Sequence, residues 1–103
     1  MTSSGPAPPT RSLATGRLPA GLTRRMIRIP PGSCRPYRPL EWAGKIVLVY
    51  QGDIELEGLS GRRYVFRSGS LVHLDRLPLG CIHNEGPQLA VMIAVGRLAG
   101  PES

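Results

Sequence analysis

The sequence lacks a hydrophobic run long enough to cross a membrane, and it has little cysteine. Its longest apolar runs cover residues 46–50 and 89–95, whereas a membrane-spanning helix needs about 18 apolar residues in succession. The N-terminal region has no apolar stretch of the about 7–15 residues that form the core of a signal peptide. The two cysteines are too few for a disulfide framework. These absences favour a protein of the reducing cytoplasm that makes no contact with a membrane.

The sequence also lacks the 3.6-residue apolar period of an amphipathic helix. Its 103 residues suffice for one small domain, and its 13 glycines and 11 prolines favour short elements joined by turns. Short apolar or β-branched runs recur between these turns, which is typical of an all-β sandwich or barrel. We expect strands over residues 22–29, 45–50, 54–57, 63–66, 71–75, 82–84 and 89–95.

Acidic residues are absent from residues 1–25, where four arginines supply most of the net charge of +6. Residues 1–20 are rich in Pro, Gly, Ser, Thr and Ala, so they cannot bury enough apolar surface to offset the entropy of ordering. We therefore expect a disordered tail over residues 1–20, a β-barrel over residues 21–97 and a C-terminal tail over residues 98–103. A basic arm can touch nucleic acid, but a solvated tail is the simpler interpretation, and we do not expect nucleic acid as a partner.

The strand predicted around Ile46–Tyr50 is apolar on both of its faces. One face can line a barrel interior. The other must pack against a second sheet, the N-terminal tail or another subunit. We therefore expect a homodimer.

Four turn residues and one hairpin give the sequence a resemblance to a known family. Gly32 and Gly52 stand at the two ends of a motif of the form G-x5-H-x-H-x3,4-E-x6-G, and Gly52 lies in the hairpin sequence VYQGDIELEG. Gly69 and Asn84 stand fifteen residues apart, at the ends of a second motif, G-x5-P-x-G-x2-H-x3-N. Over residues 26–97 the sequence thus resembles the cupin superfamily, in particular its small single-domain, RmlC-like members. The resemblance implies a double-stranded β-helix, or jelly-roll barrel.

The resemblance does not extend to the metal ligands of the family. The positions at which metal-binding cupins carry three histidines and a glutamate hold Arg38, Leu40, Lys45 and Gly80 here. Arg stays protonated, Leu and Gly have no donor atom, and Lys would first have to lose its proton. We therefore expect no metal at the family's site and no other cofactor.

Two cations replace the metal ligands, which changes the ligand that the barrel would favour. If Arg38 and Lys45 point inward, as the ligands they replace do, they would bind a carboxylate, enolate or phosphate. A desolvated Lys45 could also act as a base. The alternative is that both side chains reach the surface.

Two histidines are candidates for proton transfer. On the strand predicted over residues 71–75, His73 shares a face with Asp75, and such a pair suits a general acid or base. The alternative is an exposed polar stripe, with the intervening apolar residues in the core. We take His73, Lys45 and Asp75 as candidate catalytic residues. The candidate ligand-binding residues are Arg38, Tyr37, Glu41, Trp42 and His83, of which Tyr37 and Trp42 could equally fill the core.

A different metal set is also conceivable. Cys34, Cys81, His73 and His83 are two thiols and two imidazoles, a composition that zinc accepts. Their spacing is not that of a zinc motif, however, and Cys81 and His83 on one strand would give at most two ligands. We favour ordinary thiols and histidines.

These observations leave two function classes open. In one, a metal-independent cupin-like barrel binds a small anionic organic metabolite and isomerises, epimerises or cyclises it, as cupin-like enzymes of bacterial secondary metabolism do. In the other, the barrel is a non-catalytic ligand-binding or regulatory module, whose basic tail makes weak contacts with a partner or nucleic acid.

Overall fold

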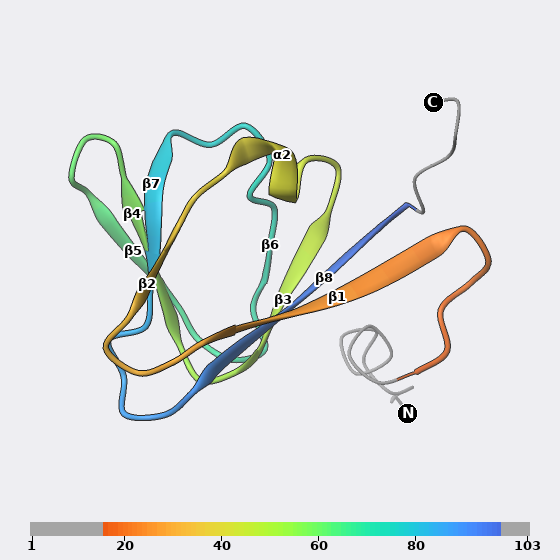
Figure 1. Cartoon of the computed structure of the whole chain (residues 1–103), viewed down its shortest axis with the longest axis horizontal. Helices are drawn as coiled ribbons and strands as arrows, with labels where there is room; N and C mark the ends of the chain where they lie inside the picture. Colours follow the sequence, from red (N-terminus) through yellow and green to blue (C-terminus); the bar gives the residue numbers. More distant parts are fainter. Residues whose placement is uncertain (1–15, 98–103) are drawn as a thin grey trace, which may run out of the picture.

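Eight strands and one short helix account for the regular structure of residues 16–97, which are the residues that the computed structural model describes (Figure 1). Every pairing between the strands is antiparallel. The elements are β1 (Leu22–Ile29), β2 (Cys34–Pro36), α2 (Pro39–Trp42), β3 (Ile46–Gln51), β4 (Ile54–Gly58), β5 (Arg63–Phe66), β6 (Leu71–Val72), β7 (Leu79–His83) and β8 (Ala90–Arg97).

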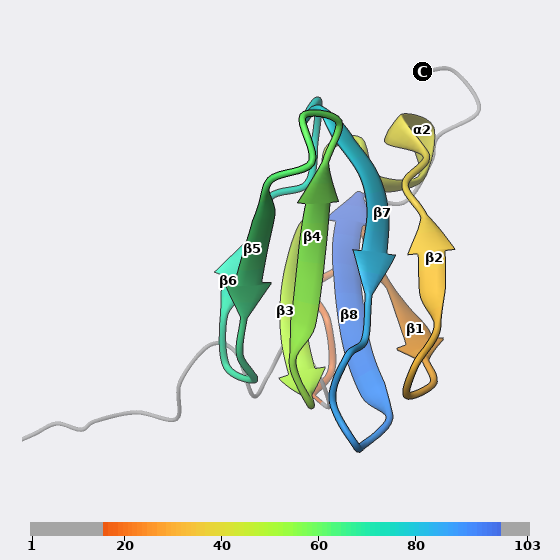
Figure 2. The same cartoon turned by 90° about the vertical axis from the view of Figure 1, so that its left-hand side faces the viewer.

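The strands form two four-stranded sheets, with the orders β1-β8-β3-β6 and β2-β7-β4-β5. Figure 2 shows one sheet in front of the other, with β4 and β7 lying over β3 and β8. Only β4 and β5 follow one another within a sheet; every other connection crosses between the sheets. This is the jelly-roll topology, so the all-β barrel predicted from the sequence is confirmed.

The core lies between the two sheets because the strands alternate apolar and polar side chains. On β4 the predicted alternation is confirmed: Ile54 and Leu56 are buried, while Glu55 and Glu57 lie on the other face. The space between the sheets is filled by apolar side chains of β1, β3, β4, β7 and β8, of α2 and of two loops. They are Ile27, Ile29, Tyr37, Trp42, Val47, Val49, Ile54, Leu56, Leu74, Leu79, Ile82, Ala90, Met92 and Ala94.

The expected strands are present, with three differences at the Pro-rich segment and the short strands. Residues 33–42, for which we expected no strand, contain β2 and α2. Pro36 is tolerated because β2 is an edge strand, where one ladder of hydrogen bonds is absent. The strand expected over residues 71–75 ends at Val72, and the one expected over residues 82–84 is the longer β7. Residues 1–15 and 98–103 of the predicted tails lie outside the described residues.

The outer face of the first sheet carries a second apolar cluster. Leu48, Val91, Ile93 and Val95 are buried there, and Leu18 packs against them with Leu89. A segment that precedes β1 therefore covers part of the face for which a second subunit was expected. The homodimer stays a prediction. No helix within residues 16–97 is long and apolar enough to span a bilayer.

The turn between β3 and β4 requires glycine at position 52. Gly52 has a φ of +72°, and a Cβ there would lie 2.9 Å from the carbonyl oxygen of Leu89. Gly61 has a similar φ of +92°, but a Cβ there would meet nothing within 4 Å. We expect Gly52→Ala to lower the free energy of unfolding by about 2–3 kcal/mol and Gly61→Ala by about 1 kcal/mol, because only the first adds a backbone clash to the conformational cost. Urea unfolding measures both, and equal losses would contradict the role given to the Leu89 contact.

Candidate functional site

Most of the residues predicted to form a site lie near α2, at one end of the barrel (Figure 1). Tyr37 is buried, and its hydroxyl donates a hydrogen bond to the carbonyl oxygen of Leu74. Trp42 has no exposed surface. Both side chains therefore belong to the apolar core that closes this end.

The two candidate cations do not share a pocket. Arg38 is exposed and lines a pocket of about 250 Å³ together with Arg35, Pro36 and Glu41. Lys45 is half-buried at the start of β3, and its stem lies over Gly96, where a Cβ would come within 2.8 Å of the Lys45 Cγ. The pair of inward cations that would grip one anion is thus not assembled.

Glu41 holds the open edge of the barrel together. Its carboxylate is ion-paired with Arg25 of β1 at 3.1 Å and with Arg35 of β2. The Glu41 side chain is only 14% exposed, so screening by solvent is reduced. Because the Glu41 carboxylate is paired with both guanidinium groups and offsets one of their two positive charges, this end of the barrel is a weaker anion site than its arginine content suggests.

His73 and Asp75 do not form the expected pair on one strand face. The strand β6 ends at Val72, so neither His73 nor Asp75 lies on a strand. His73 is exposed, whereas Leu74 is fully buried. Asp75 instead accepts a hydrogen bond of 3.3 Å from the backbone N–H of Gly44. This carboxylate ties the loop that follows β6 to the turn between α2 and β3.

The family's metal site does not fit the residues that occupy its positions. Leu40 is 91% exposed, and Arg38 is exposed as well. Gly80 has no donor atom in its side chain, and Lys45 covers Gly96 with its aliphatic stem. These residues offer no set of ligands for an ion.

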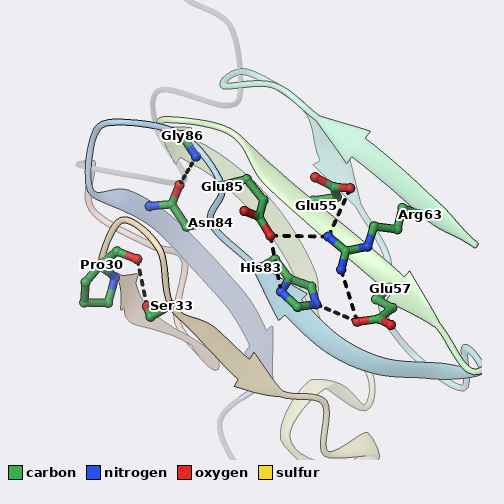
Figure 3. Close-up of polar contacts among 9 residues, drawn as sticks. All are labelled: Pro30, Ser33, Glu55, Glu57, Arg63, His83, Asn84, Glu85 and Gly86. Atoms are coloured by element: carbon green, nitrogen blue, oxygen red, sulfur yellow. Dashed lines mark hydrogen bonds and ion pairs between the residues drawn. The ribbon is translucent and has the colours of Figure 1, made fainter. Parts of the chain in front are cut away.

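His83 lies away from the other predicted residues, on the outer face of the second sheet (Figure 3). Its Nε2 is 2.6 Å from the Oε1 of Glu57 on β4. Arg63 of β5 reaches the same group of acids, at 3.4 Å from Glu55, 3.3 Å from Glu85 and 3.8 Å from Glu57. The hydrogen bond from His83, together with the charge of Arg63, lowers the pKa of Glu57.

The two cysteines lie on this same outer face. Partial desolvation and a hydrogen bond with Cys34 raise the pKa of the Cys81 thiol. Both thiols are free, and Cys34 is exposed. Of the four sulfur and nitrogen donors considered from the sequence, the sheet therefore gathers Cys34, Cys81 and His83, while His73 lies elsewhere.

A larger pocket lies between the β4–β5 hairpin and the loop that precedes β7. Both of these segments lie at the same end of the barrel as α2 (Figure 2). The volume of the pocket is about 530 Å³. Sequence reasoning did not find it, although apolar residues in turns, such as Leu59 and Leu77, were a usable signal. The lining residues are Leu56, Gly58, Leu59, Ser60, Tyr64, Phe66, Leu77, Pro78 and Leu79.

Comparison with known proteins finds several solved structures with a similar fold. No family model matches the sequence, and no curated protein matches it. The fold is similar to a Cupin_2 domain of an XRE family transcriptional regulator from Enterobacter cloacae, with a TM-score of 0.58, 18% identity and coverage of 78% of this chain and 84% of that one.

Two further solved structures have a similar fold. An RmlC-like cupin family protein with a double-stranded β-helix fold, from Methanocaldococcus jannaschii, has a TM-score of 0.57 and 14% identity, over 74% of this chain and 69% of that one. A protein from Neisseria meningitidis has a TM-score of 0.56 and 10% identity, over 80% of this chain and 79% of that one. The cupin resemblance seen in the sequence is thus confirmed at the level of the fold: this chain is a double-stranded β-helix of the cupin type.

Proposed function

We propose that this protein binds a small, largely apolar organic molecule in the pocket between the β4–β5 hairpin and the loop before β7. The observation that carries the proposal is the lining of that pocket, to which residues 16–97 contribute no charged side chain. Its volume of about 530 Å³ falls within the range of about 300–1,000 Å³ that is usual for small-molecule sites.

The pocket has a buried floor and an exposed apolar rim. Leu56 and Leu79 are 3% and 8% exposed and form the floor, against which Phe66 packs. Leu59 on the rim is 74% exposed, and Tyr64 is 46% exposed. A ligand that covers this rim gains about 25 cal/mol for each Å² of apolar surface removed from water. An aromatic or alicyclic molecule would fit such a lining.

The lining favours binding over catalysis. Its polar side-chain groups are the hydroxyls of Ser60 and Tyr64, which can orient a ligand but are poor acids and bases near neutral pH. His73, Lys45 and Asp75, the residues predicted to be catalytic, lie outside the lining. Of the two classes left open by the sequence, the ligand-binding module is therefore the better supported, and an apolar ligand is better supported than an anionic one.

A charge placed in the pocket should weaken the binding of an apolar ligand. We expect Leu77→Asp to weaken the binding of the neutral fluorescent probe N-phenyl-1-naphthylamine at least about tenfold, because a carboxylate in an apolar cavity resists desolvation. Leu77 is 38% exposed, so the variant should fold. Fluorescence titration with direct excitation of the probe gives the affinity.

Leu40→Asp is the matched control, since Leu40 is an exposed leucine outside the pocket. It should bind the probe as the unmodified chain does. Equal binding by the Leu77→Asp variant would refute the proposed site. Tight binding of an anionic probe that depends on Arg38 and Lys45 would instead support the anionic ligand first expected from the sequence.

A further inference from the structure

The register of three neighbouring strands places four metal-binding side chains on one face of the second sheet. Cys34 of β2 lies opposite His83 of β7, and Cys81 of β7 lies opposite Glu57 of β4. Residues that face one another on adjacent strands point to the same side of a sheet. The intervening pair, Leu56 and Ile82, is buried in the core, so the four polar side chains point outward.

The donor atoms of three of these residues already lie close together. A carboxylate oxygen of Glu57, the Sγ of Cys81 and a ring nitrogen of His83 are all within 4.8 Å of one another. The thiol of Cys34 lies near enough to that of Cys81 to raise its pKa. Ligand atoms in a tetrahedral zinc site stand about 2.0–2.3 Å from the metal, and so roughly 3–4 Å from each other. Small side-chain rotations would bring the donors of Glu57, Cys81 and His83 to that spacing, and the thiol of Cys34 would turn toward them from the neighbouring edge strand.

The charges around the cluster favour a cation, although the chain as a whole is basic. Three of its seven acidic residues, Glu55, Glu57 and Glu85, are gathered here around the single cation Arg63. Arg63 lies nearer to Glu55 and Glu85 than to Glu57, at 3.4 and 3.3 Å against 3.8 Å. Glu57 can therefore turn to a metal while Arg63 keeps two carboxylate partners.

From this geometry we propose that the outer face of the β2-β7-β4 sheet binds one zinc ion through Cys34, Cys81, His83 and Glu57. Two thiolates, an imidazole and a carboxylate form a set that zinc accepts, and the sulfur ligands disfavour Mg²⁺ and Ca²⁺. The Nε2 of His83 faces Glu57, while its Nδ1 lies 3.8 Å from Glu85, which can orient the ring once Nε2 is bound.

This site is distinct from the family's metal position and from the apolar pocket. It lies on the opposite face of the sheet from the core residues Leu56 and Ile82. The His83 and Glu57 side chains are 15% and 35% exposed, so an ion can enter directly from solvent. A bound ion would join the three-residue edge strand β2 to β7 and β4 and so stabilise the folded chain.

Titration of the reduced full-length chain with Co²⁺, as a spectroscopic substitute for zinc, tests the proposal. We expect one ion per chain, with thiolate-to-cobalt charge-transfer bands in the near ultraviolet and visible bands typical of tetrahedral Co²⁺. Addition of Zn²⁺ should displace the Co²⁺. Cys81→Ser and His83→Asn should each weaken binding by about tenfold to a hundredfold, and Cys34→Ser should remove part of the charge-transfer intensity.

Matched substitutions separate ligands from their surroundings. His73→Asn removes an exposed histidine outside the cluster and should leave binding unchanged. Glu57→Gln should cost far more affinity than Glu55→Gln, although both remove one negative charge beside Arg63. Circular dichroism of each variant shows whether it has folded, and Glu57→Gln keeps the test valid if a cysteine variant does not fold.

The same titration defines what would overturn the site. Absence of 1:1 binding under reducing conditions, or a spectrum that persists in the Cys81→Ser and His83→Asn variants, would refute it. Alkylation of the reduced chain with iodoacetamide should abolish Co²⁺ binding. Binding that survives alkylation of both thiols would also count against the thiolate ligands.

Discussion

Replacing Trp42 with alanine is expected to lower the free energy of unfolding by about 3–5 kcal/mol. Trp42 has no exposed surface and is the largest side chain of the core. It is held by α2, a helix of only four residues that closes one end of the barrel. Because a small domain has a total stability of about 5–15 kcal/mol, the variant should lose a large part of its stability at room temperature. Thermal unfolding followed by circular dichroism measures the loss, since the substitution removes the sole tryptophan.

Trp42→Phe separates the volume of the side chain from its indole N–H. Within residues 16–97 the Nε1 of Trp42 is buried without a hydrogen-bond partner, so removal of this group eliminates an unsatisfied donor. The phenylalanine variant should therefore lose only about 1–2 kcal/mol of its free energy of unfolding. The cavity that it leaves is smaller than in the alanine variant, and removal of the unsatisfied N–H offsets part of its cost. If both variants unfold as the unmodified chain does, Trp42 does not support the core as its burial indicates.

The sequence predicted the strands well because local pattern decides them. The alternation of Ile54 and Leu56 with Glu55 and Glu57 identified both faces of β4 before any contact was known. Glycine placement was equally informative: Gly52 and Gly69, the ends of two motifs, both take a positive φ. Each of these features depends on neighbours within a few residues of the same strand or turn.

The sites were less predictable because they depend on register between distant strands. His83 and Glu57 are 26 residues apart, and only the pairing of β4 with β7 brings them to 2.6 Å. Cys34 joins them through the pairing of β2 with β7, and no strand was predicted at the position of β2. A shift of one residue in either register would turn these side chains into the core.

The residues predicted around the family's metal position show a second reason why the site was hard to predict. Their positions were inferred from spacing alone, and spacing does not give side-chain direction. Glu41 is occupied by two arginines, and Asp75 by the backbone N–H of Gly44. Polar residues near the end of a barrel can stabilise the fold through ion pairs and hydrogen bonds, as Glu41 and Asp75 do here.

The side chain of Asn84 is expected to contribute as much to the free energy of unfolding as a large core side chain such as Trp42. Its side chain is 1% exposed and makes three hydrogen bonds. The Nδ2 group donates to the carbonyl oxygens of Ile29 at 2.8 Å and Gln88 at 2.7 Å. The Oδ1 accepts from the N–H of Gly86 at 2.9 Å (Figure 3). This one amide therefore joins the end of β1 to the loop between β7 and β8.

Asn84→Ala should lower the free energy of unfolding by about 3–5 kcal/mol. The substitution leaves the Ile29 carbonyl without this donor in a buried environment, and each buried polar group left unsatisfied costs about 1–3 kcal/mol. Urea unfolding at pH 7 measures the loss. A change below about 1 kcal/mol would show that water replaces the amide and that Asn84 does not hold the loop.

Asn84→Asp tests the hydrogen bonds at nearly constant volume. At pH 7 a carboxylate would face two carbonyl oxygens, so repulsion and desolvation should make this variant at least as unstable as Asn84→Ala. The same repulsion raises the pKa of the new carboxyl group in the folded state above its usual value near 3.9. Stability relative to Asn84→Ala should therefore be regained as the pH falls, when the protonated acid can donate one hydrogen bond, and be lost as the pH rises through the raised pKa. If the difference between the two variants is independent of pH, the Asn84 side chain acts through its shape and not through the donors that it supplies to β1 and the β7–β8 loop.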